Sequence, residues 1–99
     1  MDRAFNFRLW RNWLDAKAEE LCVEGVSTRF SSRDDFAALQ LDGKHAAGSF
    51  RNWPNGFADF EVLDTGSGVA TINATMIEVF DDNFESVFDS FLTAFMKVN

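Results

Sequence analysis

The spacing of apolar residues changes twice along the chain, and this change restricts the folds that the chain can adopt. Apolar side chains recur at helical spacing near both ends, whereas the middle consists of short segments with alternating or β-branched residues. A first helix is therefore predicted from about Ala4 to Glu24, and a second one after Asp82. The predicted buried side of the first helix holds Phe7, Trp10, Trp13, Leu14, Ala18 and Leu21.

The middle of the chain is predicted to form an antiparallel sheet. Its candidate strands are residues 26–31, 36–41, 46–53, 57–63 and 69–80. Asp42-Gly43 and Asn55-Gly56 are strong hairpin signals, because these residues tolerate the positive φ that tight turns use. Short turns require antiparallel neighbours. We therefore expect one α+β domain over residues 1–99, an α-β-β-β-β-α chain. Its antiparallel β-meander has four or five strands, and the flanking N- and C-terminal helices pack on one face.

Capping residues mark the ends of both predicted helices. Asp2 is expected to cap the first helix and Gly25 to end it, while Asp82 with Glu85 resembles a capping box for the second. The second helix has the clearest apolar stripe in the chain. Its members are Phe84, Val87, Phe88, Phe91, Leu92, Phe95 and Met96.

Composition excludes several classes of function. The chain carries sixteen acidic and nine basic residues, a formal charge of −7, which disfavours binding to nucleic acid or to an anionic membrane. No apolar run reaches the roughly 18–20 residues of a membrane span. The single cysteine, Cys22, cannot form an internal disulfide, so a reducing cytoplasm is the expected compartment. No metal site or cofactor is expected, because Asp81-Asp82-Asn83 lacks the spacing of a calcium loop and His45 is the only histidine.

The acidic residues are concentrated in one part of the sequence. Residues 1–53 hold eight acids and eight bases, whereas residues 54–99 hold eight acids and one base, which gives −7 for that part alone. This distribution predicts an acidic surface that attracts a basic protein partner. Solubility alone is the alternative explanation.

The segment after Pro54 contains the candidate site. Strand alternation places Ala58, Phe60 and Val62 toward the helices, and Asp59 and Glu61 on the open face of the sheet. An aromatic residue beside carboxylates on a rigid sheet suits a protein interface. The alternative is a solvated face on which Trp53 folds over its own hairpin. The predicted partner-binding residues are Arg51, Trp53, Asn55, Phe57, Asp59, Glu61 and Asp64.

Catalysis is not expected from these carboxylates. Acid–base chemistry needs a pocket that separates the pKa values of two carboxyl groups, and the sequence indicates no such pocket. We therefore predict that the chain is not an enzyme, and a small enzyme is the third hypothesis after the two binding functions below.

The chain resembles small immunity proteins of bacterial polymorphic toxin systems. The resemblance lies in Trp53, Gly56, the run Asp59-Phe60-Glu61-Val62-Leu63-Asp64, and Gly66 and Gly68, placed between two helices. It is similar to TriTu-type immunity proteins, which protect against an ADP-ribosyltransferase toxin that modifies elongation factor Tu. The resemblance implies a non-enzymatic antitoxin that binds its cognate toxin and covers the toxin's basic active-site cleft.

A second binding function fits the same composition. Chaperones or adaptors of secreted effectors are also small, acidic α+β proteins. Such a protein would hold an extended segment of its client along a sheet edge or in an apolar groove.

Overall fold

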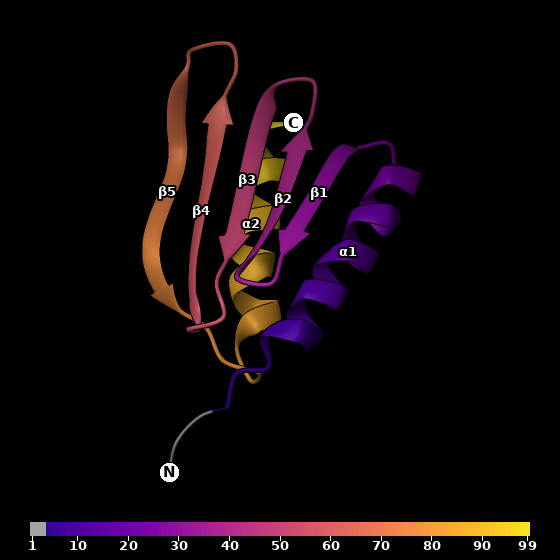
Figure 1. Cartoon of the computed structure of the whole chain (residues 1–99). Helices are drawn as coiled ribbons and strands as arrows, with labels where there is room; N and C mark the ends of the chain where they lie inside the picture. The colour runs from indigo at the N-terminus through magenta and orange to yellow at the C-terminus, as the bar shows by residue number, and fades with distance from the viewer. Residues whose placement is uncertain (1–3) are drawn as a thin grey trace.

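A computed structural model describes residues 4–99, which form two helices and five strands (Figure 1). The elements are α1 (Phe7–Val23), β1 (Ser27–Arg33), β2 (Phe36–Asp42), β3 (Ala46–Asn52), β4 (Phe57–Asp64), β5 (Val69–Glu78) and α2 (Phe84–Val98).

The five strands form one sheet in chain order. Each strand is antiparallel to the next, and the spatial order is β1-β2-β3-β4-β5. The predicted meander is confirmed, and of its two variants the five-stranded one is correct. The order leaves β1 and β5 at the two edges of the sheet (Figure 1).

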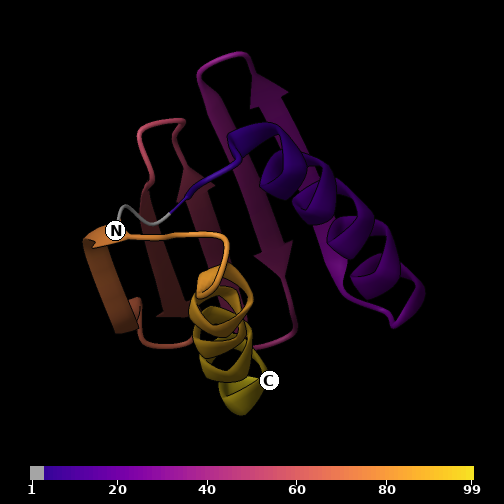
Figure 2. The ribbon, with the colours of Figure 1, turned by 90° about the horizontal axis from the view of Figure 1, so that it is seen from below.

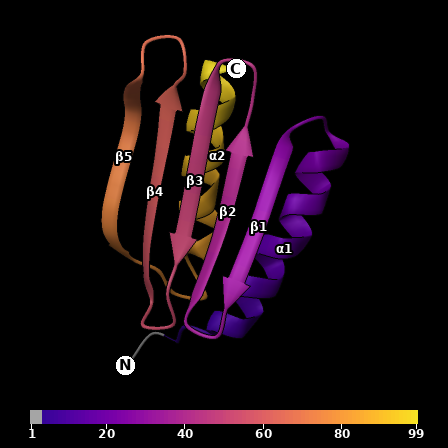
Figure 3. The ribbon, with the colours of Figure 1, turned by 45° about the horizontal axis from the view of Figure 1, so that its top comes forward.

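Both helices lie on the same face of the sheet, as predicted. α1 packs against β1 and β2, and α2 packs against β3 and β4. Figure 2 shows the two helices side by side on one side of the strands. Figure 3 shows the other face, in front of which no described element lies. None of the helices in residues 4–99 is both long enough and apolar enough to cross a lipid bilayer.

The apolar stripe of α2 supplies much of the core. Phe84, Phe88, Phe91 and Phe95 are all buried, whereas Met96, which the helical spacing had placed in the same stripe, is half exposed. The ring of Phe50 on β3 contacts the rings of three of these residues, with centroid distances of 5.3–5.7 Å. Gly48 makes this approach possible, because a Cβ atom there would lie 3.0 Å from the Phe91 ring.

The first helix begins later than predicted. Asn6 is its N-cap, and the Asn6 side chain accepts a hydrogen bond from the Leu9 N–H at 3.1 Å. The expected cap, Asp2, lies outside the described residues. Ala4 and Asn6 are bonded to Asp81 instead: the Asp81 N–H donates to the Ala4 carbonyl at 2.9 Å, and Asp81 Oδ1 accepts from the Asn6 N–H at 2.9 Å. These bonds to the loop before α2 take the place of the first turn of the predicted helix.

The second helix also begins one residue later than predicted. Its N-cap position is Asn83 and not Asp82. The Asn83 side chain accepts a hydrogen bond from the Phe80 N–H at 2.6 Å and caps no N–H of α2. Capping pattern alone could not separate these two neighbouring residues, since both types are good caps.

The hairpin between β2 and β3 is confirmed, but the reason for its glycine is different. Gly43 is not among the residues with positive φ. A Cβ atom at Gly43 would come within 2.5 Å of the Asn99 side chain. Asn99 Oδ1 accepts from the N–H groups of His45 and Ala46, at 2.7 and 3.1 Å. A side chain at position 43 would therefore displace the Asn99 side chain, 56 positions away, whereas the turn conformation itself does not call for glycine.

Candidate partner-binding face

The open face of the sheet carries the side chains that alternation placed there. In β4, Ala58, Phe60 and Val62 are buried under the helices, whereas Asp59 and Glu61 are partly exposed on the other side. The register places Arg51 of β3 directly opposite Asp59. Arg51 and Asp59, both among the predicted partner-binding residues, are therefore neighbours across the β3–β4 hairpin.

Charge changes sign across this face. Arg29 and Arg33 project from β1 and Arg51 from β3, whereas the carboxylates of Asp59 and Glu61 lie on β4. Among the described residues Arg51 and Asp59 form no ion pair with each other, and Asp59 Oδ1 accepts a hydrogen bond from the Met76 N–H at 2.8 Å. The second Asp59 oxygen and the Arg51 guanidinium therefore remain for groups outside the chain.

An aromatic cluster occupies one end of the open face. The Trp53 ring lies 5.9 Å from the Phe36 ring of β2, so it contacts the neighbouring hairpin. A hollow of about 400 Å³ on one side of Trp53 is lined by Trp53, Asn55, Phe57, Asp59 and Met76. A second hollow of about 520 Å³ lies on the Phe36 side and includes Arg33 and Asp35.

The structure thus brings four of the predicted residues into one hollow. Trp53, Asn55, Phe57 and Asp59 line it together, and Met76 of β5 completes it. Met76 and Phe36 were not predicted. Phe36 gives no signal beyond that of an ordinary strand residue.

A change in the burial pattern of β5 accounts for the position of Met76. Simple alternation in β5 places Met76 on the helix side together with Ile72 and Ala74. Ile77, however, is the next half-buried residue, and it lies an odd number of positions after Ala74. Such a shift indicates a β-bulge, and the register does skip there: Ala58 is opposite Ile77 and Phe60 is opposite Ala74. The bulge places Met76 on the open face.

The remaining predicted residues lie elsewhere. Asp64 is five residues from Asp59, about 17 Å along the strand, and its Oδ1 accepts from the Gly66 and Ser67 N–H groups at 2.9 and 3.3 Å. Glu61 lines a separate hollow of about 180 Å³ that also includes Asp42 of β2. Asn55, although in the aromatic hollow, accepts from the Phe57 N–H at 3.1 Å and so shapes the turn.

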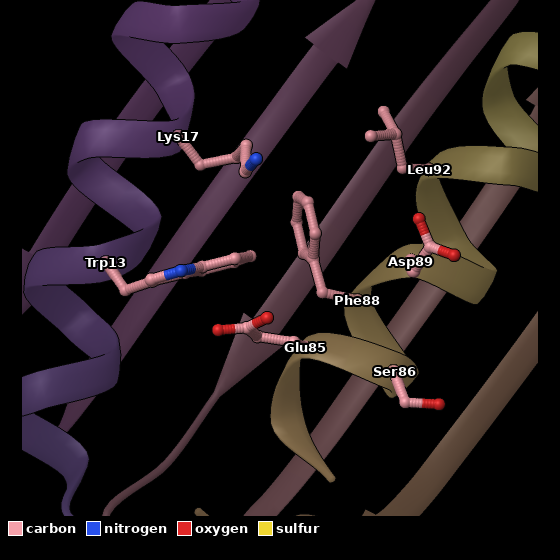
Figure 4. Close-up of a pocket in the computed structure, with 7 residues that line it drawn as sticks. All are labelled: Trp13, Lys17, Glu85, Ser86, Phe88, Asp89 and Leu92. Atoms are coloured by element: carbon pink, nitrogen blue, oxygen red, sulfur yellow. The ribbon is translucent and has the colours of Figure 1, made fainter.

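The acidic residues of α2 lie on the opposite side of the molecule. Glu85 and Asp89 line a groove of about 400 Å³ between α1 and α2, where the Trp13 and Phe88 rings face one another (Figure 4). The ammonium of Lys17 lies 5.2 Å from the centre of the Trp13 ring and 3.3 Å from Glu20. The predicted acidic surface is therefore divided into an open-face part and a helix-side part.

Within residues 4–99 the structure groups no three His, Cys, Asp or Glu side chains in a way that would hold a metal ion. The chain shows no significant match to a known protein family, to a curated protein or to a solved structure.

Proposed function

We propose that this chain is an immunity protein, which neutralises a cognate antibacterial toxin by binding it through the open face of the sheet. The supporting observation is the hollow beside Trp53, where aromatic side chains meet carboxylates on a face that no described element covers. Partly exposed aromatic rings with adjacent charges are typical of the centres of protein interfaces. The toxin as partner rests on the resemblance of residues 53–68 to TriTu-type immunity proteins.

The mechanism is occlusion and needs no chemistry from this chain. Trp53 and Phe57 supply apolar area that is lost to water on binding, and Asp59 and Glu61 pair with basic side chains of the toxin. A basic cleft attracts the acidic protein over a distance, and the bound sheet then blocks entry of the toxin's substrate. An ADP-ribosyltransferase, which binds an anionic dinucleotide, is the toxin class that the resemblance implies.

The first experiment is co-expression with a candidate ADP-ribosyltransferase toxin domain, the toxin class that the resemblance implies. We expect cells that produce both proteins to survive, the two proteins to purify as a complex, and the purified complex to lack toxin activity. Cells that produce the toxin without this chain are the control, and these cells should die. Cell death despite a normal level of the folded chain would contradict the proposal.

The second experiment locates the interface with a matched pair of variants. Asp59→Asn with Glu61→Gln removes two negative charges and keeps the shape and one acceptor oxygen on each side chain. Glu85→Gln with Asp89→Asn makes the same change, from −7 to −5, on the helix side. Leaving a buried charge of the partner unpaired typically costs about 2–5 kcal/mol, so the first variant should bind the toxin at least about thirtyfold more weakly. Equal affinity of the two variants, measured by calorimetry, would place the interface elsewhere.

A chaperone or adaptor function makes a different prediction. A client strand would pair with the edge strand β5, whose residues Val69–Ile77 include no charged side chain. The register of β5 shifts twice, however, and such irregularities interrupt the regular row of hydrogen-bonding groups that strand addition needs. In the same co-expression experiment, a complex that keeps its toxic activity would support the chaperone and contradict the immunity protein.

A further inference from the structure

Met76 has a backbone conformation that is unusual for its side chain. Its φ is +57°, and it is the one described residue other than glycine with positive φ. Left-handed backbone is unfavourable for residues with a Cβ atom, and such strain persists only where the surrounding structure imposes it. The Met76 side chain is also 68% exposed, so burial of its side chain does not explain the conformation.

Asp59 holds this conformation. Its Oδ1 accepts a hydrogen bond from the Met76 N–H at 2.8 Å. The bulge sets two residues of β5, Thr75 and Met76, against Asp59 of β4. Without an acceptor from the open face, the Met76 N–H in the bulge would lose its partner. Asp59 is therefore a positioning residue for Met76, and its second oxygen remains for another contact.

The bulge places the Met76 side chain in the lining of the hollow, beside Trp53 and Phe57. Without it, alternation would direct the Met76 side chain toward α2, and the space beside Trp53 and Phe57 would open toward the edge of the sheet. With it, a flexible thioether lies opposite two aromatic rings and lines the space of about 400 Å³ with them. Methionine adapts its shape to apolar groups and makes favourable contacts with aromatic rings.

The negative charge around the hollow favours basic residues of a partner protein beside the bound side chain. The Asp59 carboxylate lines the hollow, and Glu78 of β5 shares this face because it lies opposite Phe57, whereas Glu61 lines the separate hollow described above. The one cation on the adjoining strand is Arg51 of β3. We propose that this hollow binds one apolar side chain of a partner protein, and that lysine or arginine residues flank this side chain in the partner's sequence. In this proposal Asp59 positions Met76 for the contact. The inference rests on the proposed binding through the open face and specifies the contact.

The probe is a set of short capped peptides. The protein is labelled with ¹³C at its methionine methyl groups and with ¹⁵N, so that Met76 and the Trp53 indole N–H both report on the hollow. A capped Lys-Leu-Lys peptide should shift both signals saturably. Met96, half exposed on α2, is the internal control and should not shift. Glu-Leu-Glu and Lys-Ser-Lys peptides should bind at least about tenfold more weakly, since each lacks one half of the recognised chemistry.

Each unfavourable result overturns the inference. A Met76 signal that Lys-Leu-Lys does not move shows that the hollow is not a docking site for this chemistry. Equal binding of Glu-Leu-Glu shows that the carboxylates do not select the neighbour. A shift that depends on protein concentration without peptide assigns the hollow to a second copy of the chain.

Variants separate a docking role of Met76 from a structural one. Met76→Gly removes the backbone strain and the side chain together. It should therefore raise the urea midpoint of unfolding, and the peptide should no longer shift the Trp53 indole N–H signal. A raised midpoint with unchanged binding, or a lowered midpoint, contradicts the inference. Asp59→Asn keeps the acceptor and should leave the Met76 signal of the free protein in place. Asp59→Ala should move that signal.

These results are independent of the toxin experiments. If the peptide binds but the chain does not protect cells from the toxin, the hollow remains a docking site and the immunity function is wrong. Protection without peptide binding would retain the immunity function and reject this contact.

Discussion

Single polar side chains join parts of this molecule that are far apart in the sequence, and Asp81 joins the loop before α2 to the start of α1. Its Oδ1 accepts from the backbone N–H of Asn6 at 2.9 Å and from the indole N–H of Trp10 at 2.8 Å. Trp10 is 6% exposed and stacks on Phe84 at 4.4 Å, so its N–H has little access to water. The carboxylate thereby fixes the start of α1 beside the start of α2.

Replacement of Asp81 should destabilise the fold through these two bonds. Asp81→Ala leaves the Trp10 N–H without its acceptor, and we expect a loss of about 1–3 kcal/mol in the free energy of unfolding. Asp89→Ala, an exposed acid on the same side of the molecule, should change it by no more than about 0.5 kcal/mol. Urea unfolding of both variants tests this. Similar values for the two would show that the Asp81 bonds contribute nothing.

At the scale of elements, the fold depends on how closely α2 approaches β3. The Phe91 ring lies over Gly48, and a Cβ atom at Gly48 would be 3.0 Å from two of its carbons. Phe91 also contacts the rings of Phe50 and Phe60 at 5.6 and 5.8 Å, so it cannot move without disturbing both strands. The glycine therefore sets the distance between helix and sheet.

Gly48→Ala should push the helix and strand apart. We expect a loss of about 1–3 kcal/mol in unfolding free energy from overpacking. Ser49→Ala, the next residue on the open face, is the control and should change it by no more than about 0.5 kcal/mol. In the double variant Gly48→Ala with Phe91→Leu, the smaller side chain should recover part of the loss. Strictly additive losses would contradict the proposed contact.

At the scale of the whole molecule, net charge and local charge have separate effects. The seven excess negative charges act together at long range, although they lie on two sides of the domain. Contact with a partner, by contrast, involves one side. The rates of binding and of dissociation should therefore respond differently to the same charge change.

Association kinetics with the proposed toxin partner test this separation. Asp59→Asn with Glu61→Gln and Glu85→Gln with Asp89→Asn lower the net charge equally, so both should slow association to a similar extent at low salt. Added salt should reduce this difference from the unmodified protein. Only the open-face variant should also dissociate faster. Faster dissociation of the helix-side variant alone would place the contact in the groove between the helices.

Much of the fold was predictable from local patterns. The helical stripe of α2 and the strand alternation of β4 depend on neighbours in the sequence, because burial of one face repeats with the period of the element. The open-face positions of Asp59 and Glu61 followed from the same rule. The exact helix starts did not. The backbone groups of Ala4 and Asn6 form hydrogen bonds with Asp81, and the Asn83 side chain accepts from the Phe80 N–H and caps no N–H of α2.

The sequence by itself determined which side chains face the helices and which face outward, and it located the candidate site on β4. Only the tertiary structure decided that Met76 joins that site and that the acids are divided between two sides. Periodicity specifies a face within one element. Register, bulges and contacts between distant residues arise when the elements pack together, and those contacts placed Met76 beside Trp53.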